Sequence, residues 1–137
     1  MKRVIFSICA LLLTISAIGQ NNTFTIGDLI YETTSANTVE VHDCNSSATA
    51  VTIPESIINP NDDATYSVTS IGSSAFYACY SLEEVILQNS IATIENNAFQ
   101  NCTKLTEIII PENIRSILTD IKNHTFAAAS LYCRSYL

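Results

Sequence analysis

The residues best suited to chemistry in this sequence are a histidine, an aspartate and a cysteine in succession, His42-Asp43-Cys44. A cysteine near a histidine can act as a nucleophile when the imidazole takes the thiol proton. His124, with Ser130 or Cys133, offers similar residue types far along the chain. Neither group has a glycine elbow, an oxyanion loop or metal-ligand spacing beside it. Because adjacent residues of a strand face opposite sides, we predict no catalytic residues and no enzyme activity.

A second polar group has the residue types of a cation site. Asn59, Asn61, Asp62 and Asp63 carry the oxygen ligands that calcium prefers. An ordered calcium loop also needs a glycine at its sharp turn and a bidentate glutamate, and this segment has neither. The segment is therefore predicted to be a plain turn, and we expect no metal and no cofactor.

Four cysteines follow the first 20 residues, and an even number in an exported chain suggests disulfides. They are Cys44, Cys79, Cys102 and Cys133. Cys79 and Cys102 are 23 residues apart at the same position of a repeat, so their Cβ vectors should be parallel, which is poor geometry for a bridge. Cys44 and Cys133 lie near opposite ends of the chain. We therefore expect small buried side chains instead of disulfides.

The elements that must position these residues follow from that repeat. The stretch from Ile71 to Leu87 returns as the stretch from Ile94 to Ile110, with the matched residues 23 apart. The end of each copy has the spacing L-x-x-L-x-L of leucine-rich repeats, with valine or isoleucine at some positions. Each copy also holds a bulky phenylalanine, Phe76 or Phe99, which we expect to stack in the core. A single copy cannot cover its own apolar edge, so the copies must stack on one another.

We predict a mainly β fold: a short leucine-rich-repeat solenoid of 23-residue repeats, with two short strands per turn and an N-terminal β-hairpin cap. The cap is expected over residues 20–50 and the solenoid over residues 51–137. Full repeats are expected at 68–90 and 91–113. Residues 114–137 are either a degenerate third repeat that closes the end or a truncated continuation. An insertion that includes the Asn59 turn is predicted to form a loop or hairpin.

Alternation along the strands separates inward from outward side chains. Val85 and Leu87 are expected inside, which leaves Glu84 and Ile86 outside, and the 23-residue period repeats this arrangement one turn later. The outward side chains are expected to form two neighbouring rows, one of Thr52, Ile86 and Ile109 and one of Ala50, Glu84 and Glu107.

With the repeat written as C-x-x-L-x-x-[VI]-x-[IL]-P-x-x-[VI]-x-x-I-x-x-x-A-F, the chain resembles the BspA-like leucine-rich-repeat family of bacterial surface and secreted proteins. Residues 68–117 carry the resemblance. Gln88 stands where the family usually has proline, and Glu95 where it usually has glycine. The resemblance implies a non-catalytic binding or adhesion module, and it carries over no particular ligand.

The N-terminus has the features of a signal peptide. Lys2 and Arg3 precede an uncharged run, Val4 to Ile18, and the small residue Gly19 follows. The run is shorter than the roughly 20 residues that a bilayer core requires. We therefore expect residues 1–19 to be removed, the mature chain to be secreted or held at the cell surface, and no transmembrane segment to remain after cleavage.

The charge of the chain restricts its partners. The formal net charge is −7, and loss of the leader would remove two more basic residues. Such a surface repels phosphate backbones, so we exclude nucleic acid. We expect the outward rows, with Thr52, Glu84, Ile86, Glu107 and Ile109, to bind an extracellular protein or a surface glycan, and the C-terminal edge to permit self-association. The alternative is a structural or vestigial part of a larger surface array with no ligand of its own.

Export gives a direct test of the leader. Mass spectrometry of the secreted chain should find its N-terminus at or near Gln20, because signal peptidase cleaves after small residues. An intact Met1 terminus recovered from a membrane fraction would contradict this prediction.

Overall fold

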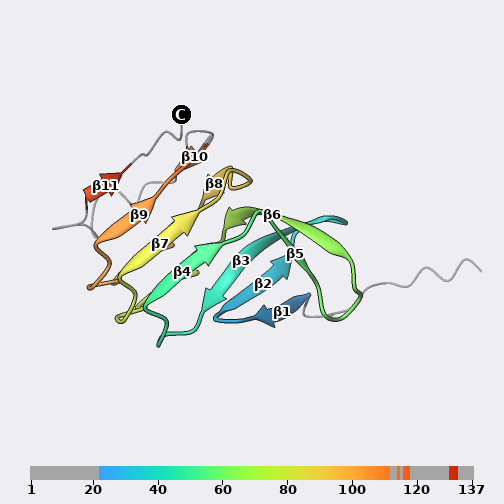
Figure 1. The fold of residues 1–137 in the computed structure, drawn as a ribbon, viewed down its shortest axis with the longest axis horizontal. Coiled ribbons are helices and arrows are strands. Elements are labelled where there is room, and N and C mark those ends of the chain that lie inside the picture. The colour runs from blue at the N-terminus through green and yellow to red at the C-terminus, as the bar shows by residue number, and fades with distance from the viewer. Residues whose placement is uncertain (1–21, 112–113, 115, 118–129, 133–137) are drawn as a thin grey trace, which may run out of the picture.

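The computed structural model describes residues 22–111, 114, 116–117 and 130–132 (Figure 1). The expected leader and most of the expected third repeat lie outside these residues. The described part of the chain consists of strands and turns and contains no helix. Accordingly, no described helix is long and apolar enough to cross a membrane.

The strands are short. In chain order they are β1 (Thr23–Ile26), β2 (Leu29–Thr33), β3 (Thr38–Cys44), β4 (Ala50–Ile53), β5 (Ser56–Ile58), β6 (Thr65–Ile71), β7 (Glu84–Leu87), β8 (Thr93–Ile94), β9 (Glu107–Ile109), β10 (Ser116–Ile117) and β11 (Ser130–Tyr132).

The strands form two sheets, and each repeat contributes one strand to each sheet. Sheet A has the order β1-β2-β3-β6-β8-β10, with β5 also paired to β6, and sheet B has the order β11-β9-β7-β4. The pairs along the repeats are parallel in both sheets: β6 with β8 and β8 with β10 in one, β4 with β7 and β7 with β9 in the other. The solenoid with two short strands per turn is therefore confirmed.

Alternating burial fixes the inside of the solenoid. In β7 the side chains of Val85 and Leu87 are buried, while those of Glu84 and Ile86 are only partly so, as the sequence predicted. On the opposite wall Ile71 and Ile94 are paired partners in sheet A and are fully buried. The core thus lies between the two sheets and continues from one repeat to the next.

The turns that join the sheets also stack. The backbone N–H groups of Ser74, Phe76 and Ala78 donate to carbonyl oxygens one repeat on, at 3.1, 2.7 and 2.9 Å. Ser74 and Ala78 have φ of 61° and 57°, and the residues 23 positions later, Asn97 and Asn101, have φ of 57° and 65°. Left-handed backbone is costly for most residues but is tolerated by asparagine. The repeat therefore conserves a backbone shape as well as an apolar pattern.

Two phenylalanines fill the space between the turns and the strands. The rings of Phe76 and Phe99 are stacked, with centroids 4.9 Å apart and planes inclined by 12°. Both side chains are buried, which confirms the expected stack. Stacking of aromatic rings adds to the free energy gained from burying them.

The cap is a three-stranded meander that extends sheet A. β2 and β3 form the predicted antiparallel hairpin, and β1 adds a further antiparallel strand at its edge. β3 then pairs with β6 in parallel, which joins the cap to the first repeat. Phe24 stacks on Tyr31 with ring centroids 5.8 Å apart, so the cap brings its own aromatic pair to the continuous core.

The insertion before the first full repeat is a hairpin. β5 and β6 pair antiparallel, and the polar segment predicted to be a plain turn connects them. Asn59 Oδ1 accepts from the N–H of Asn61, and Asp62 accepts from the N–H of Ala64 and the hydroxyl of Tyr66, at 2.9, 2.9 and 2.8 Å. These side-chain oxygens hold the turn itself, which is the role that the sequence favoured for them.

The cysteines within the described residues are free and buried. Cys102 donates its thiol to the carbonyl oxygen of Phe76 at 2.9 Å, and burial raises the pKa of Cys102 to about 12. Cys44 donates its thiol to the carbonyl oxygen of Asn45 at 3.5 Å. A side-chain interaction between Cys44 and Cys79 raises the pKa of Cys44 and lowers that of Cys79, and the sequence did not indicate this interaction between cap and repeat. Cys133 lies outside the described residues.

The described parts of the tail continue both sheets. β10 pairs in parallel with β8, and β11 pairs in parallel with β9. The segment thus adds one more strand to each sheet, as a further turn of the solenoid would. The choice between a closing repeat and a truncated continuation depends on residues outside those that the structure describes.

The phenylalanine stack can be tested by truncation. Phe76→Ala or Phe99→Ala should lower the free energy of unfolding by about 3–5 kcal/mol, because each leaves a ring-sized cavity. Tyr77→Ala is the matched control: this side chain is 53% exposed, so its loss should change stability by no more than about 0.5 kcal/mol. Denaturant unfolding measures all three. Losses below about 1 kcal/mol at both phenylalanines would show that the stack contributes little.

Candidate binding face

The outward side chains of sheet B form a regular surface that we call the strand face. It is presented by β4, β7 and β9, which lie side by side in Figure 1. Its members are Ala50, Thr52, Glu84, Ile86, Glu107 and Ile109.

The register of sheet B places these side chains in the two rows that the sequence predicted. Glu84 pairs with Ala50 on one side and with Glu107 on the other. Ile86 pairs in the same way with Thr52 and with Ile109. Ala50 and Thr52 are exposed, and the four residues on β7 and β9 are partly exposed. The placement of all the predicted face residues is therefore confirmed, whereas their role in binding stays a prediction.

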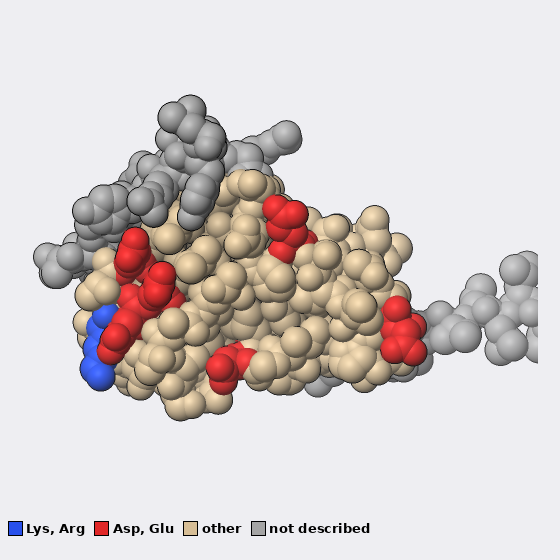
Figure 2. Space-filling view, viewed as in Figure 1, with Lys and Arg blue, Asp and Glu red and all other residues tan. Residues whose placement is uncertain are grey.

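One row carries like charges on neighbouring strands. Glu84 and Glu107 are direct partners across β7 and β9, and like charges in such positions repel. Figure 2 shows acidic side chains gathered over the start of these two strands, with one basic group beside them and an uncharged surface over much of the remaining face. Glu83 and Lys104, in the turns that lead into the strands, are both exposed. The face thus has an apolar row with an acidic margin.

A small hollow borders the strand face at β4. It has a volume of about 290 Å³ and lies between β4 and the turn that joins β1 to β2. Ala50 and Thr52 line it from the strand face, Ile26 and Leu29 line it from the cap, and Pro54 lines it directly after β4. Ligand pockets usually have volumes of about 300–1,000 Å³, so the hollow suits one side chain of a partner better than a whole small molecule.

Two exposed tyrosines were missed in the sequence. Tyr77 and Tyr80 are 53% and 57% exposed, in the turns between the sheets. The positions 23 residues later are Gln100 and Thr103, so the aromatic character does not repeat. That lack of repetition was the available signal, because a core position must stay apolar in each copy while a surface position need not.

The side chains of His42 and Cys44 do not form a nucleophile pair. The expected reason, alternation along a regular strand, is wrong. His42 and Cys44 are two residues apart and would share a face in a regular strand. Instead β3 has a bulge, in which Tyr31 pairs with Val41 but Ile30 pairs with Asp43. His42 is consequently exposed while Cys44 is buried. His124 and Cys133 lie outside the described residues.

The parallel pairing of the repeat strands in two sheets defines the class of the protein: it is a leucine-rich-repeat solenoid. The family described as BspA type leucine rich repeat region (6 copies) matches residues 43–133, and the chain belongs to this family. The match begins within β3, so it includes the end of the segment that we assigned to the cap.

Three solved structures show the same fold. A leucine-rich repeat protein from Bacteroides ovatus is 33% identical over 66% of this chain, with a TM-score of 0.60. A leucine rich cell surface protein from Faecalibacterium prausnitzii is 27% identical over 69%, with a TM-score of 0.59, and a leucine rich repeat protein from T. pallidum is 29% identical over 69%, with a TM-score of 0.58. These matches span 24%, 26% and 42% of the three relatives. No curated protein matches the chain.

The repulsion within the acidic row can be measured. Glu84→Lys would place opposite charges on β7 and β9 and should raise the free energy of unfolding by about 0.2–1 kcal/mol at low salt. Glu55→Lys makes the same change of charge at an exposed turn between β4 and β5. It is the control for the effect of a less negative net charge on stability. Denaturant unfolding at two salt concentrations separates the effects, because salt screens exposed charges. Equal shifts in the two variants would show that Glu84 and Glu107 do not interact.

Proposed function

We propose that the protein is an exported, non-catalytic binding module whose strand face recognises an extracellular protein or a surface glycan. The observation that supports this proposal is the pair of adjacent rows, in which Ile86 and Ile109 lie beside Glu84 and Glu107. The Glu84–Glu107 repulsion would be relieved by a basic group on a partner, and the isoleucine row would bury apolar surface against it. The face therefore favours a partner with both apolar and basic groups.

The rigidity of the solenoid supports the same proposal. The strands of the face are fixed by parallel pairing and by inward side chains such as Val85 and Ile108, which are buried. A flat face that is already ordered loses little conformational entropy on binding. Stacked repeats commonly present extended surfaces of this kind to their partners. Because the strand face spans the three short strands β4, β7 and β9, we expect modest affinity unless several copies act together.

The non-catalytic part of the proposal rests on what the described residues bring together. His42 is exposed and Cys44 is buried, so the residues suited to nucleophilic catalysis are separated. The Asn59 turn uses its oxygens for its own hydrogen bonds. Export is supported by the N-terminal sequence and by a relative that is named a cell surface protein.

The experiment is a pair of charge substitutions in the apolar row. Partners would first be isolated with the mature chain as bait, from extracellular proteins and from a panel of surface glycans. Ile86→Lys combined with Ile109→Lys should then weaken binding at least about tenfold, since it removes the apolar contacts of two adjacent strands and adds charge. Affinity is measured by calorimetry, after unfolding curves confirm that the variant is folded.

Ile58→Lys is the matched control for this experiment. Ile58 is 63% exposed and belongs to β5 in sheet A, so the same change there should leave binding intact. Unchanged affinity of the folded double variant would exclude the strand face. A loss in the Ile58 variant alone would move the binding site to the hairpin of residues 58–67. Failure to capture any partner would favour the structural alternative.

A further inference from the structure

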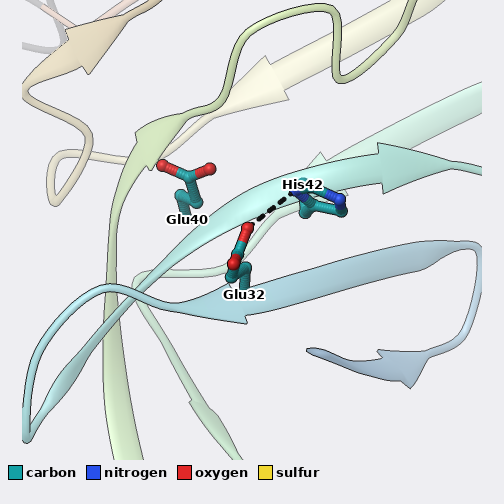
Figure 3. A group of neighbouring side chains, drawn as sticks. All are labelled: Glu32, Glu40 and His42. Carbon is teal, nitrogen blue, oxygen red and sulfur yellow. Dashed lines mark ion pairs between the residues drawn. The ribbon is translucent and has the colours of Figure 1, made fainter. Parts of the chain in front are cut away.

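Three side chains with metal-ligand chemistry lie together on the cap, away from the strand face. They are Glu32 on β2 and Glu40 and His42 on β3 (Figure 3). One ligand atom from each lies within 4.8 Å of the other two, and Nδ1 of His42 is 3.0 Å from Oε2 of Glu32. The side chains of His42 and Glu32 are 48% and 42% exposed, so the cluster is open to solvent on one side.

The backbone of the cap builds this cluster in two steps. Glu32 and Glu40 are direct partners in the pairing of β2 with β3, so the sheet holds their side chains next to each other. The bulge in β3 then leaves His42 without a partner residue on β2, between Val41 and Asp43. Bulges reorient side chains and are common beside functional sites. Here the ring of His42 lies against the carboxylate of Glu32 (Figure 3).

The cluster has more negative charge than its own residues neutralise. The pKa of Glu40 is raised by its partial burial, and then by the charges of Glu95 and Glu32, while His42 opposes the shift. Glu40 is also closely packed: a side-chain carbon added at Gly72 would lie 2.6 Å from Oε1 of Glu40. Two carboxylates therefore lie beside one imidazole, and the charge of Glu95 adds to theirs at Glu40. Like charges directly opposite each other destabilise a sheet unless something of opposite charge lies between them.

We propose that Glu32, Glu40 and His42 bind a divalent transition-metal ion, and that zinc fits them best. One imidazole nitrogen and two carboxylate oxygens form a donor set that suits zinc, with water in the fourth position on the solvent side. Calcium and magnesium prefer oxygen ligands alone, so the histidine favours zinc over both. The metal replaces the His42–Glu32 ion pair and joins β2 to β3 in the cap. The site is independent of any partner of the strand face.

Calorimetric titration of the mature chain with zinc chloride tests the site. The wild type should bind one equivalent of zinc, and binding should weaken at least about tenfold in His42→Ala and in Glu40→Gln. His124→Ala and Glu55→Gln are the matched controls, because they remove the other histidine of the sequence and a carboxylate outside the cluster. Both controls should bind zinc like the wild type. Titration with calcium chloride should give much weaker binding.

Thermal unfolding with and without zinc separates loss of the zinc site from a general loss of stability in a variant. Zinc should raise the melting temperature of the wild type and of both controls, since it binds the folded state. Without zinc, Glu40→Gln should melt at or above the wild-type temperature, because it removes a repelled charge, and zinc should not raise it further. A zinc-dependent shift in Glu40→Gln equal to that of the wild type would overturn the proposal.

Diffraction from crystals soaked in zinc chloride locates the ion. An anomalous peak should lie about 2.0–2.2 Å from Nδ1 of His42 and from an oxygen of each glutamate. A zinc peak only at other residues, or no binding at millimolar zinc, would show that the cluster is an ion pair with an unneutralised carboxylate. Equal affinity in the wild type and His42→Ala would do the same.

Discussion

The structure depends on one constraint: each repeat must place its side chains directly on those of the next. Phe76 stacks on Phe99 in the core, and the turns around these residues are joined by backbone hydrogen bonds between repeats. A repeat that lost this register would expose the apolar edge of its neighbour. The parallel pairing of the repeat strands in both sheets, the buried walls and the two outward rows all follow from the same period.

Side chains that do not take part in the stacking of the repeats carry charges that the fold does not need. The strand face keeps two glutamates on adjacent strands although they repel each other. The cap does not follow the 23-residue period, and it holds a second pair of carboxylates, those of Glu32 and Glu40, beside His42. Like charges directly opposite each other in a sheet are destabilising, so we expect a positive charge from outside the chain to stabilise both features. The core explains the fold, and these two surfaces are where ligands are to be sought.

The 23-residue period seen in the sequence was enough to predict most side-chain positions in the repeat region. It placed Phe76 on Phe99, buried Val85 and Leu87, and put Glu84 beside Glu107, because equal positions of a stacked repeat must coincide. The cap could not be deduced in this way. Its strands have no period, and a single extra residue in β3 decides where His42 and Cys44 lie. The influence of Cys44 and Cys79 on each other's pKa depends on the same register and was missed for the same reason.

The central claim is that the strand face is the binding surface, and isoleucine methyl resonances test it most directly. Ile86 and Ile109 lie on the face, whereas Ile58 lies on β5 in the other sheet. In a methyl-labelled sample of the mature chain, addition of a captured partner should shift the resonances of Ile86 and Ile109 and leave that of Ile58 unchanged. Shifts at Ile58 with none at Ile86 or Ile109 would contradict the account.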